Sequence, residues 1–339
     1  MSAAEDRVAV VVNGNAKGVT EDLVGMLDQI VQSGDLFVSR SLEEGREIAR
    51  RIVERGYPTV LTGGGDGTFT QMVTWICKEA DAQGREPPRF GMLKLGTGNA
   101  LAWVLGAQAG VVADLGRLRK EGGSRELRLV ECEGMMAPFC GVGVEAVALE
   151  DFHRVRDVMR RLPILRRYGT GALSYALAIP LLSMPRILRW PHHPVRITNL
   201  GEPALRLGVD GQPVGAPMDP GELLYEGPMR GVWASTVPYW GFGARIFPFA
   251  EDRDDRFNLR VVDIGSLDVA RHIREIWKGT YRDPRVHDFL VEHVRVELDR
   301  PLPFEIGGDA QGERQTFEVR LSRKIRVVDY YAPPPLSRG

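Results

Sequence analysis

The chain has few of the residues and runs that would place it in a specialised class of protein. Its 339 residues include three cysteines and no C-x-x-C pair, so neither a disulfide framework nor a zinc site is expected. It has no uninterrupted apolar run of about 18 residues, which argues against a membrane-spanning helix, and its first residues lack the basic and apolar segments of a signal peptide. The net charge of −1 creates no overall field that would select nucleic acid. These absences predict a globular cytoplasmic protein.

One glycine-rich stretch organises the first hundred residues. It follows a short apolar run, residues 57–61, and precedes residues 69–80, where apolar side chains recur at helical spacing. Glycines at a strand-to-helix turn let the backbone approach a ligand, and the N–H groups at a helix start favour phosphate. Phosphate would repel Asp66 unless a cation such as Mg²⁺ bridges the two; alternatively, Asp66 caps the next helix. The stretch comprises Gly63, Gly64, Gly65, Asp66, Gly67 and Thr68.

Two further glycine turns follow predicted strands. The β-branched run at residues 8–12 is typical of a strand buried on both faces of a parallel sheet, and it ends at Asn13. Another predicted strand, residues 90–95, runs into the turn at residues 96–99. Such loops lie at the carboxyl edge of a parallel sheet, where open α/β folds bind ligands. We therefore predict an α/β domain with an open parallel sheet over residues 1–125.

The pattern changes after about residue 125. Residues 126–132 and 294–298 alternate between polar and apolar side chains, and prolines and glycines separate short runs. This pattern predicts an antiparallel β domain, a sandwich or open barrel, over residues 126–320. A further helix is predicted for residues 269–278.

A helical insert, predicted for residues 149–190, interrupts the β-rich part. Between Asp151 and Arg196 lie nine arginines and two aspartates around a nearly apolar stretch, residues 171–182. Basic flanks around a short apolar helix suit a segment lying on an anionic membrane. A core helix with an arginine-rich solvated face is the alternative.

The glycine turns resemble those of the diacylglycerol kinase catalytic family of lipid kinases, which includes bacterial diacylglycerol kinases, sphingosine kinases and ceramide kinases. The resemblance implies an ATP-binding first domain and a second domain that contributes to the lipid site. It also implies that residues 321–332 return to the first domain. The motifs that carry it are residues 63–68, 96–102, 239–243, 247–250 and 254–255.

The resemblance assigns the nucleotide site to residues of the first domain. It implies that Asn13 lies by the phosphates and Ser39 near the adenosine. The loop from Gly63 to Thr68 would cradle phosphate, with Asp66 acting through Mg²⁺. Thr97 and Asn99 would hold that loop and the region of the acceptor hydroxyl, and Gly96 would belong to the nucleotide site with them.

The remaining assignments lie in the second domain. The family places an Asp-Gly-Glu before the final strands, and its Glu removes the proton from the lipid hydroxyl. The glycine register puts Asp309 at the position of that Glu, with Glu313 as the alternative base. Glu145 falls where the family has an acidic residue near the acceptor head group, and Asp255 matches a structural metal position.

These features predict an ATP- and Mg²⁺-dependent kinase that phosphorylates a lipid hydroxyl. The acceptor would be a diacylglycerol, a sphingoid base or a ceramide, and residues 100–102 look more like the sphingosine and ceramide kinase branch. The alternatives are a NAD kinase-like enzyme, a phosphofructokinase-like sugar kinase and a catalytically inactive lipid-binding protein on the same scaffold. We expect the protein to meet its lipid substrate at a membrane surface, to associate peripherally with that membrane, and to bind no nucleic acid. A homodimer is left open.

Overall fold

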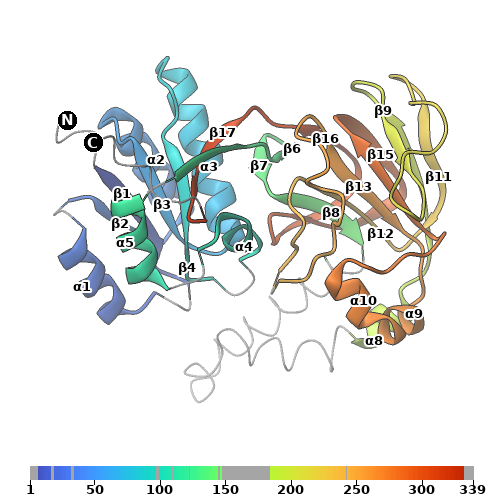
Figure 1. Cartoon of the computed structure of the whole chain (residues 1–339), viewed down its shortest axis with the longest axis horizontal. Helices are drawn as coiled ribbons and strands as arrows, with labels where there is room; N and C mark the ends of the chain where they lie inside the picture. The colour runs from blue at the N-terminus through green and yellow to red at the C-terminus, as the bar shows by residue number, and fades with distance from the viewer. Residues whose placement is uncertain are drawn as a thin grey trace, which may run out of the picture. The chain divides into compact units, whose positions relative to one another are not determined.

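The computed structural model describes residues 7–16, 19–31, 34–96, 99–107, 110–121, 123–143, 146, 184–241 and 243–331. The chain divides into two compact units: residues 1–128 with 323–339, and residues 129–322 (Figure 1). The predicted sites at Thr97 and Glu145 and most of the predicted insert lie outside the described residues.

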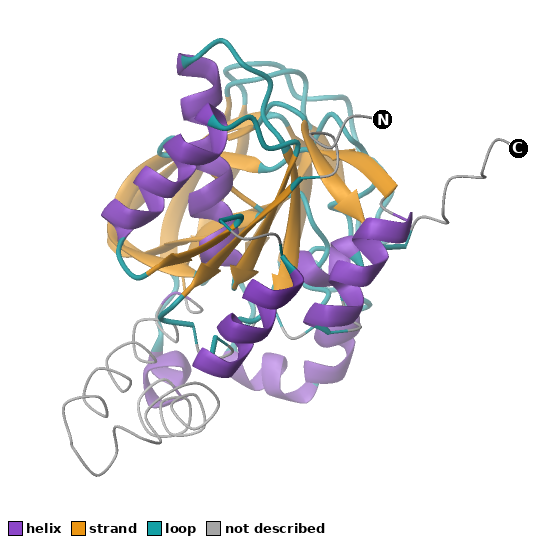
Figure 2. Cartoon of the chain, turned by 90° about the vertical axis from the view of Figure 1, so that its left-hand side faces the viewer, coloured by secondary structure: helices purple, strands orange, loops and turns teal. Residues whose placement is uncertain are grey.

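The first unit is built on a mostly parallel sheet with the strand order β2-β1-β3-β4-β17-β5. Only the β17–β5 pair is antiparallel. Helices cover both faces of this sheet (Figure 2). The strands are β1 (Val8–Asn13), β2 (Leu36–Ser39), β3 (Thr59–Gly64), β4 (Arg89–Lys94), β5 (Gly123–Leu127) and β17 (Ile325–Asp329), and the helices are α1 (Glu21–Ile30), α2 (Leu42–Glu54), α3 (Asp66–Ala82), α4 (Ala100–Leu105) and α5 (Val111–Glu121).

Local sequence explains where these elements form and end. The β-branched run of β1 is completely buried from Ala9 to Val12, as expected for a central parallel strand. The helices α1 and α2 begin at side-chain caps: Thr20 Oγ1 accepts from the Leu23 N–H at 3.2 Å, and Ser41 Oγ accepts from the Glu44 N–H at 3.1 Å. Because β1 has β2 on one side and β3 on the other, the strand order reverses between β1 and β3, which is where open α/β sheets bind ligands.

The alternating residues 126–132 belong to two strands that lie in two different sheets. The strand β5 pairs with β17 in the first unit, while β6 (Val130–Cys132) pairs with β16 (Asp309–Leu321) in the second. The chain crosses between the units at residues 128–129 and returns at residues 322–323. The returning strand β17 lies between β4 and β5, where Val327 and Val328 are fully buried.

The second unit contains an antiparallel sheet that branches at the long strand β15. Residues 294–298 of β15 pair with β9, and residues 304–306 pair with β8. Strands of both branches contribute to one hydrophobic core, as in a sandwich, and the predicted fold class is confirmed. The strands not yet given are β7 (Met135–Ala137), β8 (Phe139–Gly143), β9 (His193–Asn199), β10 (Leu205–Leu207), β11 (Leu223–Met229), β12 (Gly231–Ser235), β13 (Phe257–Val262), β14 (Val286–Val291) and β15 (His293–Ile306).

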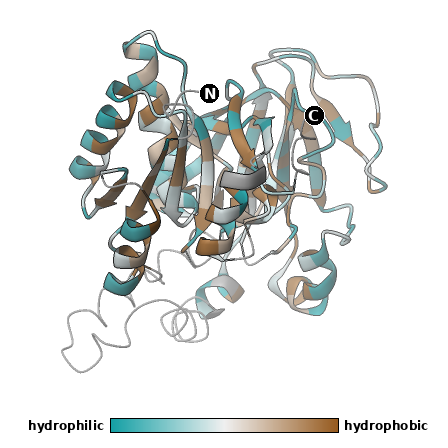
Figure 3. Cartoon of the chain, turned by 60° about the vertical axis from the view of Figure 1, so that its left-hand side comes forward, coloured by the Kyte–Doolittle hydropathy of each residue, from teal (hydrophilic) through white to brown (hydrophobic). Residues whose placement is uncertain are grey.

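The described part of the second unit contains three short helices: α8 (Met184–Arg189), α9 (Ser266–Arg271) and α10 (Ile273–Lys278). The single helix predicted for residues 269–278 is wrong, because the helical backbone breaks at His272 (φ −111°, ψ 21°). Figure 3 shows hydrophobic residues concentrated along the strands and hydrophilic residues on the outer turns of helices. Among the described residues, no helix has both the length and the apolar composition needed to cross a bilayer.

Candidate active site

The glycines of the central motif end a strand. The strand β3 continues through Gly63 and Gly64, beyond the predicted residues 57–61. A Cβ on Gly63 would lie 2.8 Å from Val12 Cγ1, and one on Gly64 would lie 2.7 Å from Thr68 Cβ. Larger residues therefore do not fit where β3 passes β1 and turns directly into α3.

The three glycine turns meet at one edge of the sheet, as the sequence predicts. The side chain of Asn13, at the end of β1, donates from Nδ2 to Thr68 Oγ1 at 3.2 Å. The turn after β4 touches the turn after β3 through backbone, because a Cβ on Gly96 would lie 2.6 Å from the Gly65 nitrogen. The loops after β1, β3 and β4 thus form one continuous surface at the carboxyl ends of these strands.

Asp66 joins the second and third turns. Its carboxylate accepts hydrogen bonds from the backbone N–H groups of Ala100, at 2.8 Å, and Leu101, at 3.0 Å, and its residue is only 7% exposed. Asp66 therefore caps α4, a helix more than thirty residues away, and the alternative prediction that it caps the helix directly after the turn is wrong.

The N-termini of α3 and α4 differ in how their backbone N–H groups are satisfied. Asn99, before α4, has a left-handed backbone (φ 51°) and uses its side chain on Gly96: Oδ1 accepts from the Gly96 N–H at 3.2 Å, and Nδ2 donates to the Gly96 carbonyl at 2.5 Å. The N-cap of α3 is Gly65, which has no side chain to accept from the first-turn N–H groups. The start of α3 therefore offers backbone donors and a positive helix dipole to an anion.

The donor set fits a magnesium ion that arrives with a triphosphate. Two backbone hydrogen bonds fix the position of the Asp66 carboxylate, which supplies oxygen ligands of the kind that Mg²⁺ prefers. No group of three or more His, Cys, Asp or Glu side chains that could hold a metal ion occurs in the described part of the chain. Since Mg²⁺ is commonly held by one or two carboxylates, substrate phosphates and water, Asp66 suffices as the protein ligand.

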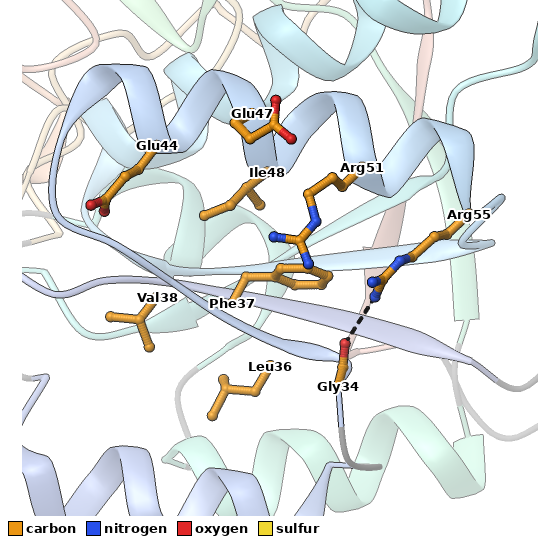
Figure 4. Close-up of a pocket in the computed structure, with 9 residues that line it drawn as sticks. All are labelled: Gly34, Leu36, Phe37, Val38, Glu44, Glu47, Ile48, Arg51 and Arg55. Carbon is orange, nitrogen blue, oxygen red and sulfur yellow. Dashed lines mark hydrogen bonds between the residues drawn. The ribbon is translucent and has the colours of Figure 1, made fainter.

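Ser39 ends the edge strand β2, directly opposite Asn13 of β1. Its hydroxyl donates to the Ser41 carbonyl at 3.0 Å. The residues of β2 that precede Ser39 and the helix α2 line an open pocket of about 360 Å³. At this pocket the Arg55 guanidinium donates to the Gly34 carbonyl at 3.2 Å (Figure 4). None of the residues predicted to bind phosphate is among those that line this pocket. The lining residues are Gly34, Leu36, Phe37, Val38, Glu44, Glu47, Ile48, Arg51 and Arg55.

The side chains around Asp255 do not fit a bound metal. Both oxygens of Asp255 accept from Arg253, at 2.8 and 2.9 Å, and Arg256 donates to one of them at 3.1 Å. The hydrogen bond from Arg253 holds the pKa of Asp255 below its usual range. A cation at this carboxylate would lie beside the guanidinium groups of Arg253 and Arg256, whose positive charges would repel it.

The predicted bases lie on a β-hairpin of the second unit. The chain turns through Gly307 (φ 59°) and Gly308 (φ 80°), which places Asp309 opposite Ile306. Two successive positive φ values match the tight two-residue hairpin turn that glycine favours. Asp309 is half-buried beside this turn, whereas Glu313 is exposed, opposite Pro303.

Sequence reasoning missed Glu305, a buried carboxyl group next to this hairpin. Its residue is 1% exposed, and its Oε1 accepts from the indole N–H of Trp240 at 3.2 Å. Burial raises the pKa of Glu305 from 4.5 to about 7; the charge of Asp309 raises it as well, and the hydrogen bond from Trp240 opposes both. A carboxylate inside the apolar run from Leu302 to Ile306 is the signal that could have revealed it.

Comparisons with known proteins bear on both units. Residues 7–132 match the model of the diacylglycerol kinase catalytic domain. Diacylglycerol kinase theta of Mus musculus is 25% identical over 284 residues, 74% of this chain and 27% of its own length. A probable lipid kinase, YegS-like, of Pseudomonas aeruginosa is 33% identical over 136 residues, 39% of this chain and 42% of its own. The aligned part of this chain thus spans about a quarter of the length of the mouse relative and less than half of that of the Pseudomonas relative.

Solved structures support the fold over almost the whole chain. Two crystal structures from Bacillus anthracis strain Sterne, both described in terms of a diacylglycerol kinase, have TM-scores of 0.66 and 0.59 at 15% and 13% identity. The first alignment covers 97% of this chain and 97% of that structure. At this identity the likeness concerns the fold alone. Residues 7–132, which contain the glycine turns that meet at Asp66, match the diacylglycerol kinase catalytic domain.

Proposed function

We propose that the chain is an ATP-dependent lipid kinase that transfers the γ-phosphoryl group to a lipid hydroxyl. The observation that carries this proposal is the Asp66 carboxylate holding the N-terminus of α4 against the glycine turn before α3. This arrangement fixes two backbone turns at the switch point of the sheet, beside a helix start that can receive phosphate. The names of the sequence relatives support a lipid as the acceptor.

Phosphoryl transfer asks the protein mainly to position its substrates and balance charge. The backbone from Gly63 to Thr68 would bind the triphosphate, and Asn13 holds that backbone through Thr68. Bound Mg²⁺, held by Asp66 together with phosphate oxygens, would neutralise part of the phosphoryl charge. Asp309 would accept the proton of the lipid hydroxyl as that oxygen attacks the γ-phosphorus and ADP leaves.

A membrane surface is the proposed source of the lipid. The corner of the second unit formed by α8, α9 and α10 exposes large apolar side chains, Leu267 (76%) and Trp277 (46%) among them. Neither α9 nor α10 contains a buried residue. These three helices carry five basic and two acidic side chains in a chain of net charge −1, which suits an anionic bilayer.

The direct test is incubation with labelled ATP, Mg²⁺ and a total lipid extract, with NAD in a parallel reaction. We expect label in a lipid product and none in NADP, and Asp309→Asn protein provides the matched background. Label in NADP would support the NAD kinase alternative. ATP binding without transfer to any lipid would support an inactive lipid-binding protein.

A further inference from the structure

Two buried acidic residues are described in the second unit, Asp288 and Glu305, and among the described residues Glu305 has no basic partner. Asp288, for comparison, is buried but receives hydrogen bonds from Arg260 at 2.8 and 2.9 Å. No described basic side chain forms an ion pair with Glu305. An ionised carboxylate there would be a buried charge without a counter-charge, which is costly, so the group favours its neutral form.

The surroundings of Glu305 also fix where its proton lies. The indole N–H of Trp240 points at Oε1, so Oε1 acts as the acceptor and the proton belongs on Oε2. Oε2 is buried and has no hydrogen-bond partner among the described residues. The neighbours of Glu305 across the sheet are the small residues Gly141, on β8, and Ala310, on β16, so they bring no polar side chain to Oε2.

We propose that Glu305 is a positioning residue for Asp309: the buried carboxyl group keeps a proton, so that the pair carries a single negative charge and that charge resides on Asp309. This inference rests on the proposed function, in which Asp309 accepts the hydroxyl proton. The two residues lie on the two arms of one tight hairpin, Glu305 next to Ile306 and Asp309 opposite Ile306. Of the two, Asp309 is the more exposed and therefore the less costly to ionise.

A single charge matters because the transferred group is itself negative. In the proposed step the acceptor O–H bond breaks, its proton goes to Asp309, the oxygen bonds to the γ-phosphorus and the bond to ADP breaks. Glu305 keeps its proton throughout. When Glu305 ionises, the second negative charge beside the reacting hydroxyl opposes the approach of the phosphoryl oxygens, so the rate falls.

Other ionisable groups close to Glu305 do not supply this behaviour. On β8, the buried thiol of Cys140 has its pKa raised well above its usual value, first by its hydrogen bond with Cys132, so it stays neutral. The three influences on the pKa of Glu305 are its burial, the Trp240 N–H and the charge of Asp309. In this proposal Asp309 is the member of the pair that carries the charge.

The first experiment needs no activity and compares thermal unfolding across pH for wild type, Glu305→Gln and Glu297→Gln. Glutamine reproduces the neutral carboxyl group, and Glu297 is an exposed glutamate on the same strand. The native state holds the Glu305 proton up to about pH 7 and the unfolded state releases it near 4.5, so wild-type stability falls with rising pH within that window. We expect Tm of Glu305→Gln relative to wild type to be higher at about pH 8 than at about pH 5, with no such trend for Glu297→Gln. Parallel curves for all three would overturn the proposal.

The second experiment measures lipid phosphorylation against pH. We expect Glu305→Gln to match wild type within about twofold at about pH 6 and to lack the wild-type fall in rate above about pH 7. Trp240→Phe removes the N–H that lowers the pKa of Glu305, so the fall should move to higher pH. A pH profile for Glu305→Gln identical to that of wild type, or an equal loss at every pH, would overturn the proposal. No phosphorylation of any lipid, with the stability trend present, would overturn the proposed function and the role of Glu305 in it, while the buried proton would stand.

Discussion

At the proposed nucleotide site, we expect both the charge and the position of Asp66 to matter. We predict that Asp66→Asn abolishes ATP binding and lowers the free energy of unfolding by about 1.5–3 kcal/mol, the usual range for hydrogen bonds to a charged group. The amide cannot accept from both Ala100 and Leu101, because its NH₂ group would face one of their N–H groups. Denaturant unfolding and calorimetric ATP titration measure the two effects.

Asp81→Asn is the matched control for this variant, because Asp81 lies on the same helix but is exposed, in an ion pair with Arg323. Exposed pairs contribute about 0–1 kcal/mol, so its unfolding and ATP binding should stay close to wild type. Normal ATP affinity in the Asp66 variant would contradict the assignment of this carboxylate to the nucleotide site.

The choice between Asp309 and Glu313 can be decided by turnover. We predict that Asp309→Asn lowers kcat by about 10²–10⁴-fold, the usual contribution of general-base catalysis, and leaves ATP binding intact. Glu313→Gln should act weakly, since Glu313 is exposed on the far side of a further glycine, Gly312. If Glu313→Gln instead causes the large loss while Asp309→Asn is active, the base is Glu313.

The sequence predicts which residues gather at the first site because glycine turns after buried strands are local signals. It could not show which helix Asp66 caps, since only the fold brings Asp66 next to Ala100, from which it is separated by 34 in the sequence. Glu305 was missed for a related reason. In a strand, a polar residue between Phe304 and Ile306 is normally the solvent side of an alternating pattern, and only the packing of Trp240 reveals that this side is covered too.

At the scale of elements, substitutions in two glycine turns should affect stability and ATP binding differently. We predict that Gly96→Ala destabilises the protein, because its Cβ would collide with the backbone of Gly65, which cannot rotate away. Gly65→Ala should fold normally: its φ of −98° suits alanine, and the nearest atom to the new Cβ is 3.7 Å away. Because that methyl group would stand where phosphate approaches the start of α3, ATP affinity should still fall.

Unfolding curves and ATP titrations of the two glycine variants make the comparison. Equal stability losses would contradict the packing described for the two turns. Full ATP affinity in Gly65→Ala would contradict phosphate binding at this helix start.

The short helices of the second unit lend themselves to a membrane test. We predict that Leu267→Glu and Trp277→Glu each reduce binding to vesicles containing an anionic phospholipid by about tenfold, since each removes an apolar contact and adds a repelled charge. Val209→Glu is the matched control, because Val209 is 51% exposed in the same unit but lies outside these helices. Vesicle sedimentation measures the binding, and equal loss in all three variants would contradict this surface.

Elements defined by their own pattern were predictable, and elements defined by their neighbours were not. The runs that became β1 and β4 carry the buried-strand pattern themselves. Residues 126–132 alternate except at Leu129 and Val130, two successive apolar residues that follow the point where the chain leaves one sheet for the other. One irregular position does not by itself reveal that β5 and β6 belong to different sheets. Apolar spacing likewise continues across His272, although the backbone there is not helical.

For the whole molecule, the decisive feature is that the first unit is completed by the end of the described chain. The strand β17 lies between β4 and β5, its Val327 and Val328 are fully buried, and the backbone N–H of Tyr330 donates to the Leu105 carbonyl at 2.9 Å. Residues 7–127 alone would expose one edge of β4 and leave β5 unpaired. We therefore expect them not to fold cooperatively.

The same topology offers a way to isolate the first unit. Ile325 of β17 lies opposite Leu127 of β5 in an antiparallel pair, so a two-residue Asn-Gly turn can join them and replace the second unit. We predict that residues 7–127 joined in this way to residues 325–331 fold cooperatively, bind ATP and transfer no phosphate to lipid, because the proposed base lies in the second unit. Circular dichroism melting and ATP titration test the first two points, with residues 7–127 as the control. A cooperative melt of the control would show that β17 is dispensable, and a folded joined chain without ATP affinity would move the nucleotide site away from the glycine turns.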